Sequence, residues 1–238
     1  MNYDGIMLGP LQECNRKAFL DSILDLCRPG KEFWLAEIGI AAGATMAGIL
    51  RALQRHRPDC DWKCAGIDIV GGWCFHSGAI RSSCGQWLEP APKLEDLPEL
   101  PARKLVYYDC GSEYFFNHAA GIQFDAVHVD GCHAPTCVAR DFLVAAPKLK
   151  VGGVMIFHDA DPWCQNDPKE IQGCGFPIGT RQALISLDIL GVPHVTGYRK
   201  GWAVEHNIIP SNAACATHNR GGQLCRGSVI IRKTAEAP

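Results

Sequence analysis

Apolar and polar positions alternate along the chain in blocks that predict strands and helices in turn. Largely apolar runs, typical of strands buried on both faces, occupy residues 32–40, 63–70, 104–109, 124–130 and 154–159. Apolar residues recur at helical spacing before, between and after these runs, in residues 10–27, 45–58, 135–146 and 180–190. This alternation predicts an α/β fold with a mostly parallel sheet and helices on both faces. Near the end of the chain, residues 194–208 predict two strands around a turn, and residues 227–233 predict one further strand.

No internal repeat or shift in composition divides the chain, so residues 1–238 are expected to form a single domain with residues 1–30 as a helical cover. Residues 71–104 and 160–179 are rich in glycine and proline and are candidate loops for binding a substrate. Ordinary packing is the alternative role for the aromatic residues of these segments, which are Trp73, Phe75, Trp87 and Trp163.

The composition is that of an ordinary globular protein, with 47% hydrophobic residues and a mean hydropathy of -0.03. A net charge of -2 and the lack of a Lys/Arg tract give no reason to expect nucleic acid or an anionic membrane as a partner. There is no secretory signal and no apolar stretch long enough to span a membrane, so we expect a cytoplasmic protein. The 13 cysteines include no C-x-x-C pair and are expected to be small buried hydrophobes, with a zinc site as the minor alternative.

Carboxylates end four of the predicted strands, and they are Asp68, Asp109, Asp130 and Asp159. The carboxyl ends of parallel strands meet at one edge of the sheet, which is where α/β proteins bind ligands. Burying several unpaired acids together is costly unless a ligand or a donor group meets them. This edge is therefore the predicted site.

The segment after the first strand carries glycines suited to a cofactor. Glu37-x-Gly39-x-x-x-Gly43-x-Thr45 has neither the G-x-G-x-x-G spacing of a dinucleotide fingerprint nor the Gly-Lys-Ser/Thr of a P-loop. Its glycines still permit close approach of the backbone to a ligand, and the helix from about Thr45 offers free N–H groups. Asp68, at the end of the second strand, is suited to accept hydrogen bonds from both hydroxyls of a ribose.

Taken together, EIGIAAGAT, GIDIV, VDGCH and LKVGGVMIFHD resemble the class I S-adenosylmethionine-dependent methyltransferases. They are similar to the branch with E-x-G-x-x-x-G-x-S/T, I-D-G-x-H and G-G-x-x-x-x-H-D, with Val129 in place of the isoleucine. The resemblance covers residues 35–159 in detail. It implies a Rossmann-like, seven-stranded, mostly parallel sheet whose last strand is antiparallel, which agrees with the hairpin predicted at residues 195–208.

The resemblance also implies how S-adenosylmethionine is bound. The methionine part would be lined by Glu37, Gly39, Gly43 and Thr45. Asp68 would hold the ribose, Asp109 and Ser112 would flank the adenine, and Asp130 would lie beside the sulfonium and the methyl acceptor. Structural alternatives exist for each position: the glycines could serve helix packing, Asp68 a turn, and Asp109 with Ser112 a helix cap.

Asp130, His133, His158 and Asp159 are the candidates for catalysis. In one alternative Asp130, His158 and Asp159 bind a divalent metal ion, for which the imidazole favours Mn, Fe or Zn over Mg. In the other, no metal is used and His133 or His158 takes the acceptor's proton. In a purely structural alternative, Asp130 caps the next helix and His133 forms a hydrogen bond near its start. Asp141, within that helix, is expected to be solvated or structural.

The function we expect is direct in-line methylation of a small-molecule acceptor such as a sugar, a phenol or a natural product, on oxygen rather than nitrogen. The alternatives are a metal-dependent hydrolase that uses Asp130, His133, His158 and Asp159, and a non-catalytic cofactor-binding subunit. The hydrolase leaves Glu37 and the glycines without a role. The expected partner is the methyl acceptor, without nucleic acid or membrane, and homodimerisation stays open.

Overall fold

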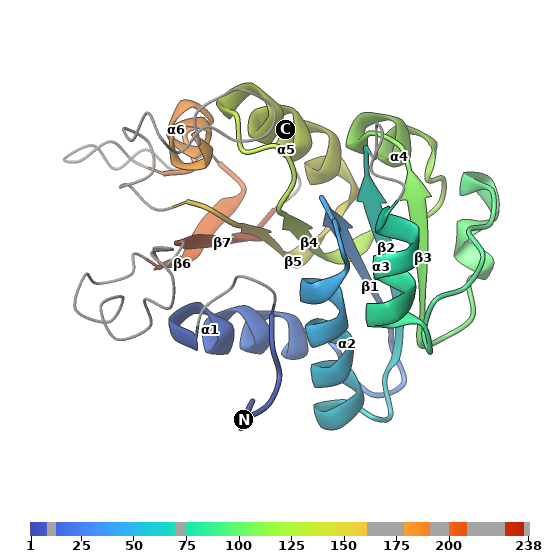
Figure 1. Cartoon of the computed structure of the whole chain (residues 1–238). Coiled ribbons are helices and arrows are strands. Elements are labelled where there is room, and N and C mark those ends of the chain that lie inside the picture. The colour runs from blue at the N-terminus through green and yellow to red at the C-terminus, as the bar shows by residue number, and fades with distance from the viewer. Residues whose placement is uncertain (9–12, 70–74, 161–178, 191–199, 209–226, 236–238) are drawn as a thin grey trace.

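A single seven-stranded sheet forms the centre of the molecule (Figure 1). The computed structural model describes residues 1–8, 13–69, 75–160, 179–190, 200–208 and 227–235. The strands follow the spatial order β3-β2-β1-β4-β5-β7-β6. Their bounds are β1 Glu32–Ile38, β2 Asp61–Asp68, β3 Lys104–Asp109, β4 Phe124–Val129, β5 Leu149–Phe157, β6 Trp202–Ile208 and β7 Ser228–Lys233. Strands β1 to β5 pair in parallel, and β7 is antiparallel to β5 and β6. The predicted fold class, including the antiparallel last strand, is confirmed.

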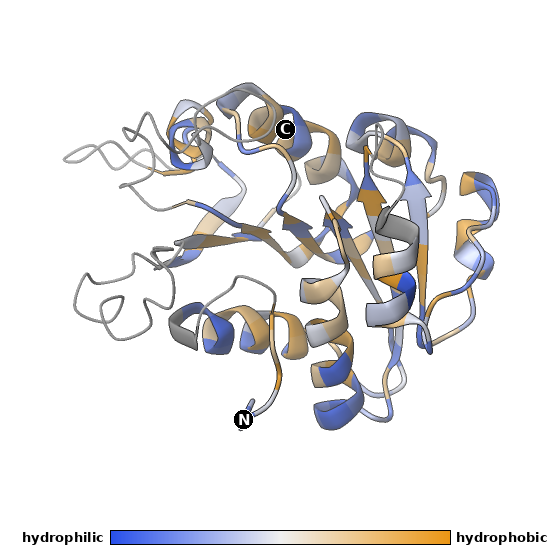
Figure 2. Cartoon of the chain, viewed as in Figure 1, coloured by the Kyte–Doolittle hydropathy of each residue, from blue (hydrophilic) through white to orange (hydrophobic). Residues whose placement is uncertain are grey.

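Helices cover both faces of the sheet (Figure 1). On one face lie α1 (Glu13–Leu24), α2 (Ala44–His56) and α3 (Phe75–Cys84). On the other lie α4 (Ser112–His118), α5 (Pro135–Ala145) and α6 (Thr180–Ser186), and two short 3₁₀ helices span Leu94–Glu99 and Ala146–Lys148. Each face has its own buried apolar cluster, because the side chains of every strand point alternately to the two sides. The hydropathy colouring shows these apolar positions along the central strands (Figure 2).

The second strand of the predicted hairpin at residues 195–208 is present as β6. β6 pairs with β7, which follows it in the chain, and Ile208 lies opposite Ser228. The first half of the predicted hairpin, residues 194–199, lies outside the described residues. The hairpin stays a prediction, and the pairing of β6 with β7 is additional to it, because apolar alternation marks a strand and not the strand with which it pairs.

The aromatic residues of the predicted substrate loops are only partly described. Trp87 is buried within the apolar cluster on the α1–α3 face, so its observed contacts are those of packing. Trp73, Trp163 and most of segment 160–179 lie outside the described residues, as does the side chain of Phe75.

The cysteines whose side chains are described contain free thiols. Cys27, Cys60, Cys64 and Cys84 are buried in the apolar cluster on the α1–α3 face, as expected for small hydrophobes. Burial raises the pKa of Cys64 well above its usual value and that of Cys84 to about 12, so both are neutral thiols at physiological pH. Among the described helices, none has the length and apolar character needed to cross a membrane.

Candidate active site

The predicted site residues lie at or beside the carboxyl ends of the parallel strands. Asp68 is level with Asp109 in the pairing of β2 with β3, and Val129 of β4 is level with Ile38 of β1 and Phe157 of β5. Asp130 therefore follows β4 at the edge where His158 and Asp159 follow β5. The structure brings the four strand-end carboxylates to one edge of the sheet, as the sequence predicted.

The turn after β1 passes very close to the end of β4. Gly39 has a φ of 84°, and a Cβ added there would overlap the carbonyl oxygen of Asp130 and the Cα of Gly131. Asp130 also donates its backbone N–H to the carbonyl of Ile38, with an N–O distance of 2.9 Å. Only glycine combines this φ with such a close approach. The two strand ends are thus held together by main-chain atoms.

The rest of this turn is tied to β2. The backbone N–H of Ala41 donates to Asp68 Oδ2 across 2.8 Å, and Ala41 itself has a φ of 43°. Gly43, with a φ of 77°, then precedes α2, and Thr45 is buried in the first turn of that helix. Asp68 therefore orders the glycine turn with one carboxylate oxygen, which leaves its other oxygen to accept from a ligand.

Glu37 is a buried carboxylate one residue from the end of β1. The residue is 1% exposed, and Oε1 lies 3.0 Å from Nδ1 of the fully buried His128. The other oxygen, Oε2, is buried and has no hydrogen-bond partner among the described residues. Burial raises the pKa of Glu37, an effect that the contact with His128 opposes. An acceptor atom is thus left unsatisfied at the base of the glycine turn.

Two acids and two histidines form a compact group beyond β4 and β5. We call Asp130, His133, His158 and Asp159 the Asp–His cluster. Nδ1 of His158 lies 2.9 Å from Asp130 Oδ1 and 3.0 Å from Asp159 Oδ1. His133 connects the same two acids, with Nε2 at 3.2 Å from Asp130 Oδ1 and Nδ1 at 3.2 Å from Asp159 Oδ2. His133, His158 and Asp159 are buried, and Asp130 is partly exposed.

The local sequence explains how the cluster is formed. His133 lies in the short turn between β4 and α5, which begins with Pro135 in its first turn. The carbonyl of His133 accepts from Gly179 N across 2.8 Å, which anchors this turn to the start of α6. On the other strand, Asp159 has a φ of 51°, an uncommon conformation for a residue other than glycine. Such backbone strain recurs at functional sites.

The cluster shifts the proton affinities of its members in opposite directions. Burial alone would lower the pKa of His158, but the carboxylates of Asp130 and Asp159 outweigh it and raise that pKa to about 10. Burial would likewise raise the pKa of Asp130, yet His158 and His133 hold it well below its usual value. At neutral pH, His158 is therefore an imidazolium between two carboxylates.

Three of these residues, Asp130, His133 and His158, have ligand atoms that all lie within 4.8 Å of one another. A second such group, one layer deeper, consists of Glu37, His128 and Asp130. Asp159, which the sequence placed among the metal ligands, contacts both histidines of the first group. The donor set mixes imidazole nitrogen with carboxylate oxygen, which suits Mn, Fe or Zn better than Mg.

On the β2–β3 side, the predicted adenine residues lie in different environments. Asp109 is exposed, and Ser112 is buried with its hydroxyl donating to Asp141 Oδ1 across 2.5 Å. Asp141 is itself buried, so it is structural and not solvated. Ile69, directly after Asp68, is an apolar side chain that is 69% exposed, and it lies near Gly111. An exposed apolar residue next to Asp68, the predicted ribose ligand, is suited to cover a flat ring.

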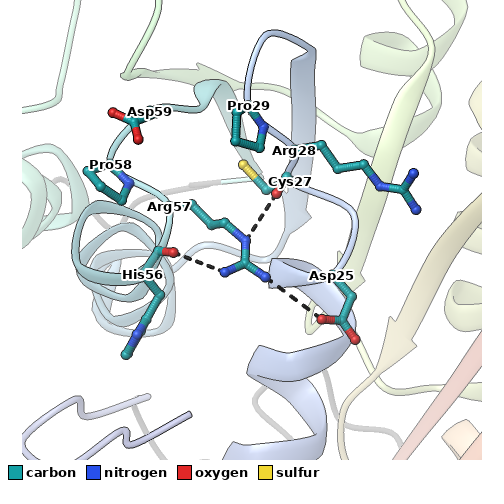
Figure 3. Close-up of a pocket in the computed structure, with 8 residues that line it drawn as sticks. All are labelled: Asp25, Cys27, Arg28, Pro29, His56, Arg57, Pro58 and Asp59. Carbon is teal, nitrogen blue, oxygen red and sulfur yellow. Dashed lines mark hydrogen bonds and ion pairs between the residues drawn. The ribbon is translucent and has the colours of Figure 1, made fainter.

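A hollow of about 530 Å³ lies elsewhere, at the amino ends of β1 and β2 (Figure 3). The side chain of Arg57 extends across it and donates to the carbonyls of Leu24, Cys27 and His56, with Asp25 3.9 Å away. Its guanidinium therefore ties the end of α2 to the segment after α1. None of the predicted site residues lines this hollow.

Residues 36–160 match a protein family described as a methyltransferase domain. This match spans the glycine turn, Asp68, Asp109 and the whole Asp–His cluster, and it covers more than half of the chain. The chain belongs to this family of methyltransferases. It is a class I S-adenosylmethionine-dependent enzyme, as the motifs indicated. Membership also decides against the hydrolase and the non-catalytic subunit that the sequence left open.

Solved structures share the methyltransferase's fold at low identity. An rRNA methylase from Streptococcus thermophilus is 12% identical with a TM-score of 0.53, over 92% of this chain and 95% of that one. The O-methyltransferase TomG from Streptomyces achromogenes, involved in tomaymycin synthesis and solved with S-adenosylmethionine, is 16% identical with a TM-score of 0.52, over 94% and 80%. These similarities show the fold alone. No curated protein matches the chain significantly.

The residues present fit the cofactor of the methyltransferase. At the base of the glycine turn, Glu37 Oε2 is a buried acceptor with no partner among the described residues. Two features of this site were missed in the sequence. The sequence pattern places His128 within a strand and Ile69 within a buried run, and neither pattern marks a site. An imidazole within an apolar strand is the signal that could have indicated His128.

Proposed function

We propose that this methyltransferase transfers the methyl group to a hydroxyl of a small molecule and that the Asp–His cluster manages the proton of that hydroxyl. The observation that carries the proposal is the cluster itself, because it places two imidazoles between two carboxylates next to the glycine turn. An aliphatic hydroxyl is a weak nucleophile at neutral pH and needs a base or a metal, whereas a phenol with a pKa near ~10 needs less help.

Within this proposal the cofactor lies along the strand ends. Glu37, Gly39, Gly43 and Thr45 hold the methionine part, and the free oxygen of Asp68 accepts from the ribose. The adenine lies against Ile69, between Asp109 and the main chain of Ser112, whose hydroxyl already donates to Asp141. When bound, S-adenosylmethionine supplies an electrophilic methyl group. The residues around it hold the two reactants in line, which supplies much of the rate.

The charge of the cluster indicates which residue accepts the proton. Burial lowers the pKa of His158, but Asp130 and Asp159 outweigh this effect and raise it to about 10, so His158 contributes one positive charge at neutral pH. His158 already holds its proton, and Asp130, with its low pKa, is a weak base. We assign the base to His133, the second imidazole of the cluster, whose ring nitrogens lie 3.2 Å from Asp130 Oδ1 and 3.2 Å from Asp159 Oδ2.

A small acceptor is favoured over nucleic acid, although one structure of similar fold is an rRNA methylase. The chain has a net charge of -2 and no tract of lysine or arginine with which to bind a phosphate backbone. Polyanion binding requires such positive charge on the protein surface.

A divalent metal ion is the second candidate for activating the hydroxyl. The observation in its favour is that ligand atoms of Asp130, His133 and His158 all lie within 4.8 Å of one another. Asp130 and His158 would hold the ion, together with His133 or Asp159, and the ion would supply Lewis acidity at this place. Occupation by a metal would require His158 to release its proton, so affinity would rise with pH.

The test is formation of S-adenosylhomocysteine with a panel of phenols, sugars and aliphatic alcohols, assayed with and without a chelator. His133→Asn is expected to lower kcat by about 10²–10⁴-fold, the range typical of a lost general base. His118→Asn is the matched control, since His118 is exposed on α4 and stacks on Tyr114. Loss of turnover with the chelator would favour the metal. Transfer to amines but to no hydroxyl, or full activity of the His133 variant, would refute the proposal.

A further inference from the structure

His128 is a fully buried imidazole inside an otherwise apolar strand. It is 0% exposed, and its Nε2 has no hydrogen-bond partner among the described residues. Burying a polar ring with one unsatisfied nitrogen costs free energy. At its level of the sheet, His128 lies between Glu37 on β1 and Ile156 on β5, and only Glu37 has a polar side chain. Among the described residues, the hydrogen bond of this ring is therefore the one between Nδ1 and Glu37.

The surroundings of His128 fix its ring on the side of the sheet that α1 covers. Ala126, two residues earlier on β4, belongs to the apolar cluster of that face. The ring of Phe19 from α1 packs edge-on against His128, with a centroid distance of 5.0 Å and an interplanar angle of 85°. A packed ring has little freedom to change rotamer. Its Nδ1 is consequently held 3.0 Å from Glu37 Oε1.

We propose that His128 is a positioning residue for cofactor binding. Its Nδ1–H donates to Glu37 Oε1 and fixes the orientation of the carboxylate. Oε2 is then left to accept from the ammonium group of the cofactor's methionine part, as the buried and unpartnered state of this oxygen allows. A hydrogen bond between an ammonium group and a carboxylate is among the stronger hydrogen bonds. Because His128 already orients Glu37, less conformational entropy of this side chain is lost when the cofactor binds. The inference rests on the proposed contact of Glu37 with the methionine part.

His128 could instead act through the Asp–His cluster, because it lies two residues before Asp130 and its ring centroid is 6.4 Å from that of His158. The two routes differ in what they change. Positioning of Glu37 alters the affinity for the cofactor, whereas an effect on the cluster alters kcat at saturating cofactor.

Three substitutions at His128 separate the hydrogen bond from simple packing. His128→Asn keeps an N–H close to the position of Nδ1, His128→Gln moves the amide toward the position of Nε2, and His128→Leu removes the donor. We expect the Kd for S-adenosylhomocysteine, measured by calorimetry, to rise at least about tenfold in the Leu and Gln variants and to stay within about threefold in the Asn variant. The kcat at saturating S-adenosylmethionine should change by less than about threefold in all three.

A double-mutant cycle with Glu37→Gln tests whether His128 acts through Glu37. Glu37→Gln alone should weaken binding, and adding His128→Leu to it should weaken binding by less than about a further twofold, because residues in one network are not additive. If the Leu variant does not fold, as judged by circular dichroism and urea unfolding, the comparison of Asn with Gln carries the test, since both side chains are polar.

The outcomes also separate this inference from the proposed cofactor placement. Unchanged binding by Glu37→Gln would refute the placement of the methionine part at Glu37. Weakened binding by Glu37→Gln with unchanged binding by His128→Leu and His128→Gln would refute the positioning role alone. A loss of kcat with unchanged Kd in the His128 variants would also overturn it, because His128 would then act on the cluster.

Discussion

Replacing Gly39 by alanine should damage both the fold and the cofactor site, and the chain contains a matched control. Gly39 and Gly152 have almost the same backbone angle, with φ of 84° and 86°. A Cβ at Gly39 would overlap main-chain atoms of Asp130 and Gly131, whereas a Cβ at Gly152 would meet no atom within 4 Å. The two alanine variants therefore share the cost of the backbone angle and differ in steric overlap.

The magnitudes follow from these two terms. Holding a residue with a Cβ in the left-handed region costs roughly 1–2 kcal/mol, and this is the whole effect expected for Gly152→Ala. Forcing extra volume against atoms that cannot move freely adds about 1–3 kcal/mol for Gly39→Ala. The overlap is with main chain, so relief requires the ends of β1 and β4 to separate. That separation would move Glu37 and Asp130 relative to each other.

Urea unfolding and calorimetric titration with S-adenosylhomocysteine measure both effects. Gly39→Ala should lose more free energy of unfolding than Gly152→Ala, by about 1–3 kcal/mol, and should bind the ligand at least about tenfold more weakly. Gly152→Ala should bind like the unmodified protein. Equal stability and equal binding of the two variants would show that the ends of β1 and β4 do not approach as closely as described. It would also refute the inference that this close approach is needed for cofactor binding.

Three further predictions concern single side chains. The acids around His158 outweigh its burial and raise its pKa from 6.5 to about 10, so its contribution to stability is complete below pH 6.5 and declines by about 1.4 kcal/mol per pH unit toward pH 10. In urea unfolding at pH 7 and 9 with a chelator present, the free energy of unfolding should decline less for His158→Gln than for the unmodified protein, and an identical decline would contradict this. Asp68→Ala should raise the Kd for S-adenosylhomocysteine by about ten- to hundredfold through lost hydrogen bonds to the ribose, and unchanged binding would refute that assignment. Ser112→Ala should lower the free energy of unfolding by about 1–3 kcal/mol, because buried Asp141 loses its donor; a loss below about 0.5 kcal/mol would show that this bond does not matter.

The ends of the parallel strands were predictable because local chemistry determines them. An apolar run stops where the chain must leave the core, so Asp68, Asp109 and Asp130 marked the edge of the sheet before any tertiary contact was known. Their motifs also indicated the family. The assignments of these residues to ribose, adenine and acceptor stay predictions, because the structure shows their places and not their ligands.

Strand pairing and burial within helices could not be predicted in the same way. β6 pairs with β7, from which residues 209–227 separate it in the chain, and the local pattern of neither strand indicates its partner. Asp141 is polar and belongs to a helix with partly exposed positions, so its sequence context left it solvated or structural. Its burial depends on α4 packing beside α5, which brings Ser112 within hydrogen-bonding distance.

The amino-acid sequence by itself determined the order of strands and helices, the edge where the site lies and the family of methyltransferases, because these depend on local periodicity and on short motifs. Only the tertiary structure decided which polar atoms meet. Glu37 and His128 are 91 positions apart and share one hydrogen bond, and His158 retains its proton because Asp130 and Asp159 lie 2.9 and 3.0 Å from its Nδ1. Electrostatic interactions and desolvation depend on distance and burial, and both quantities exist only once the chain has folded.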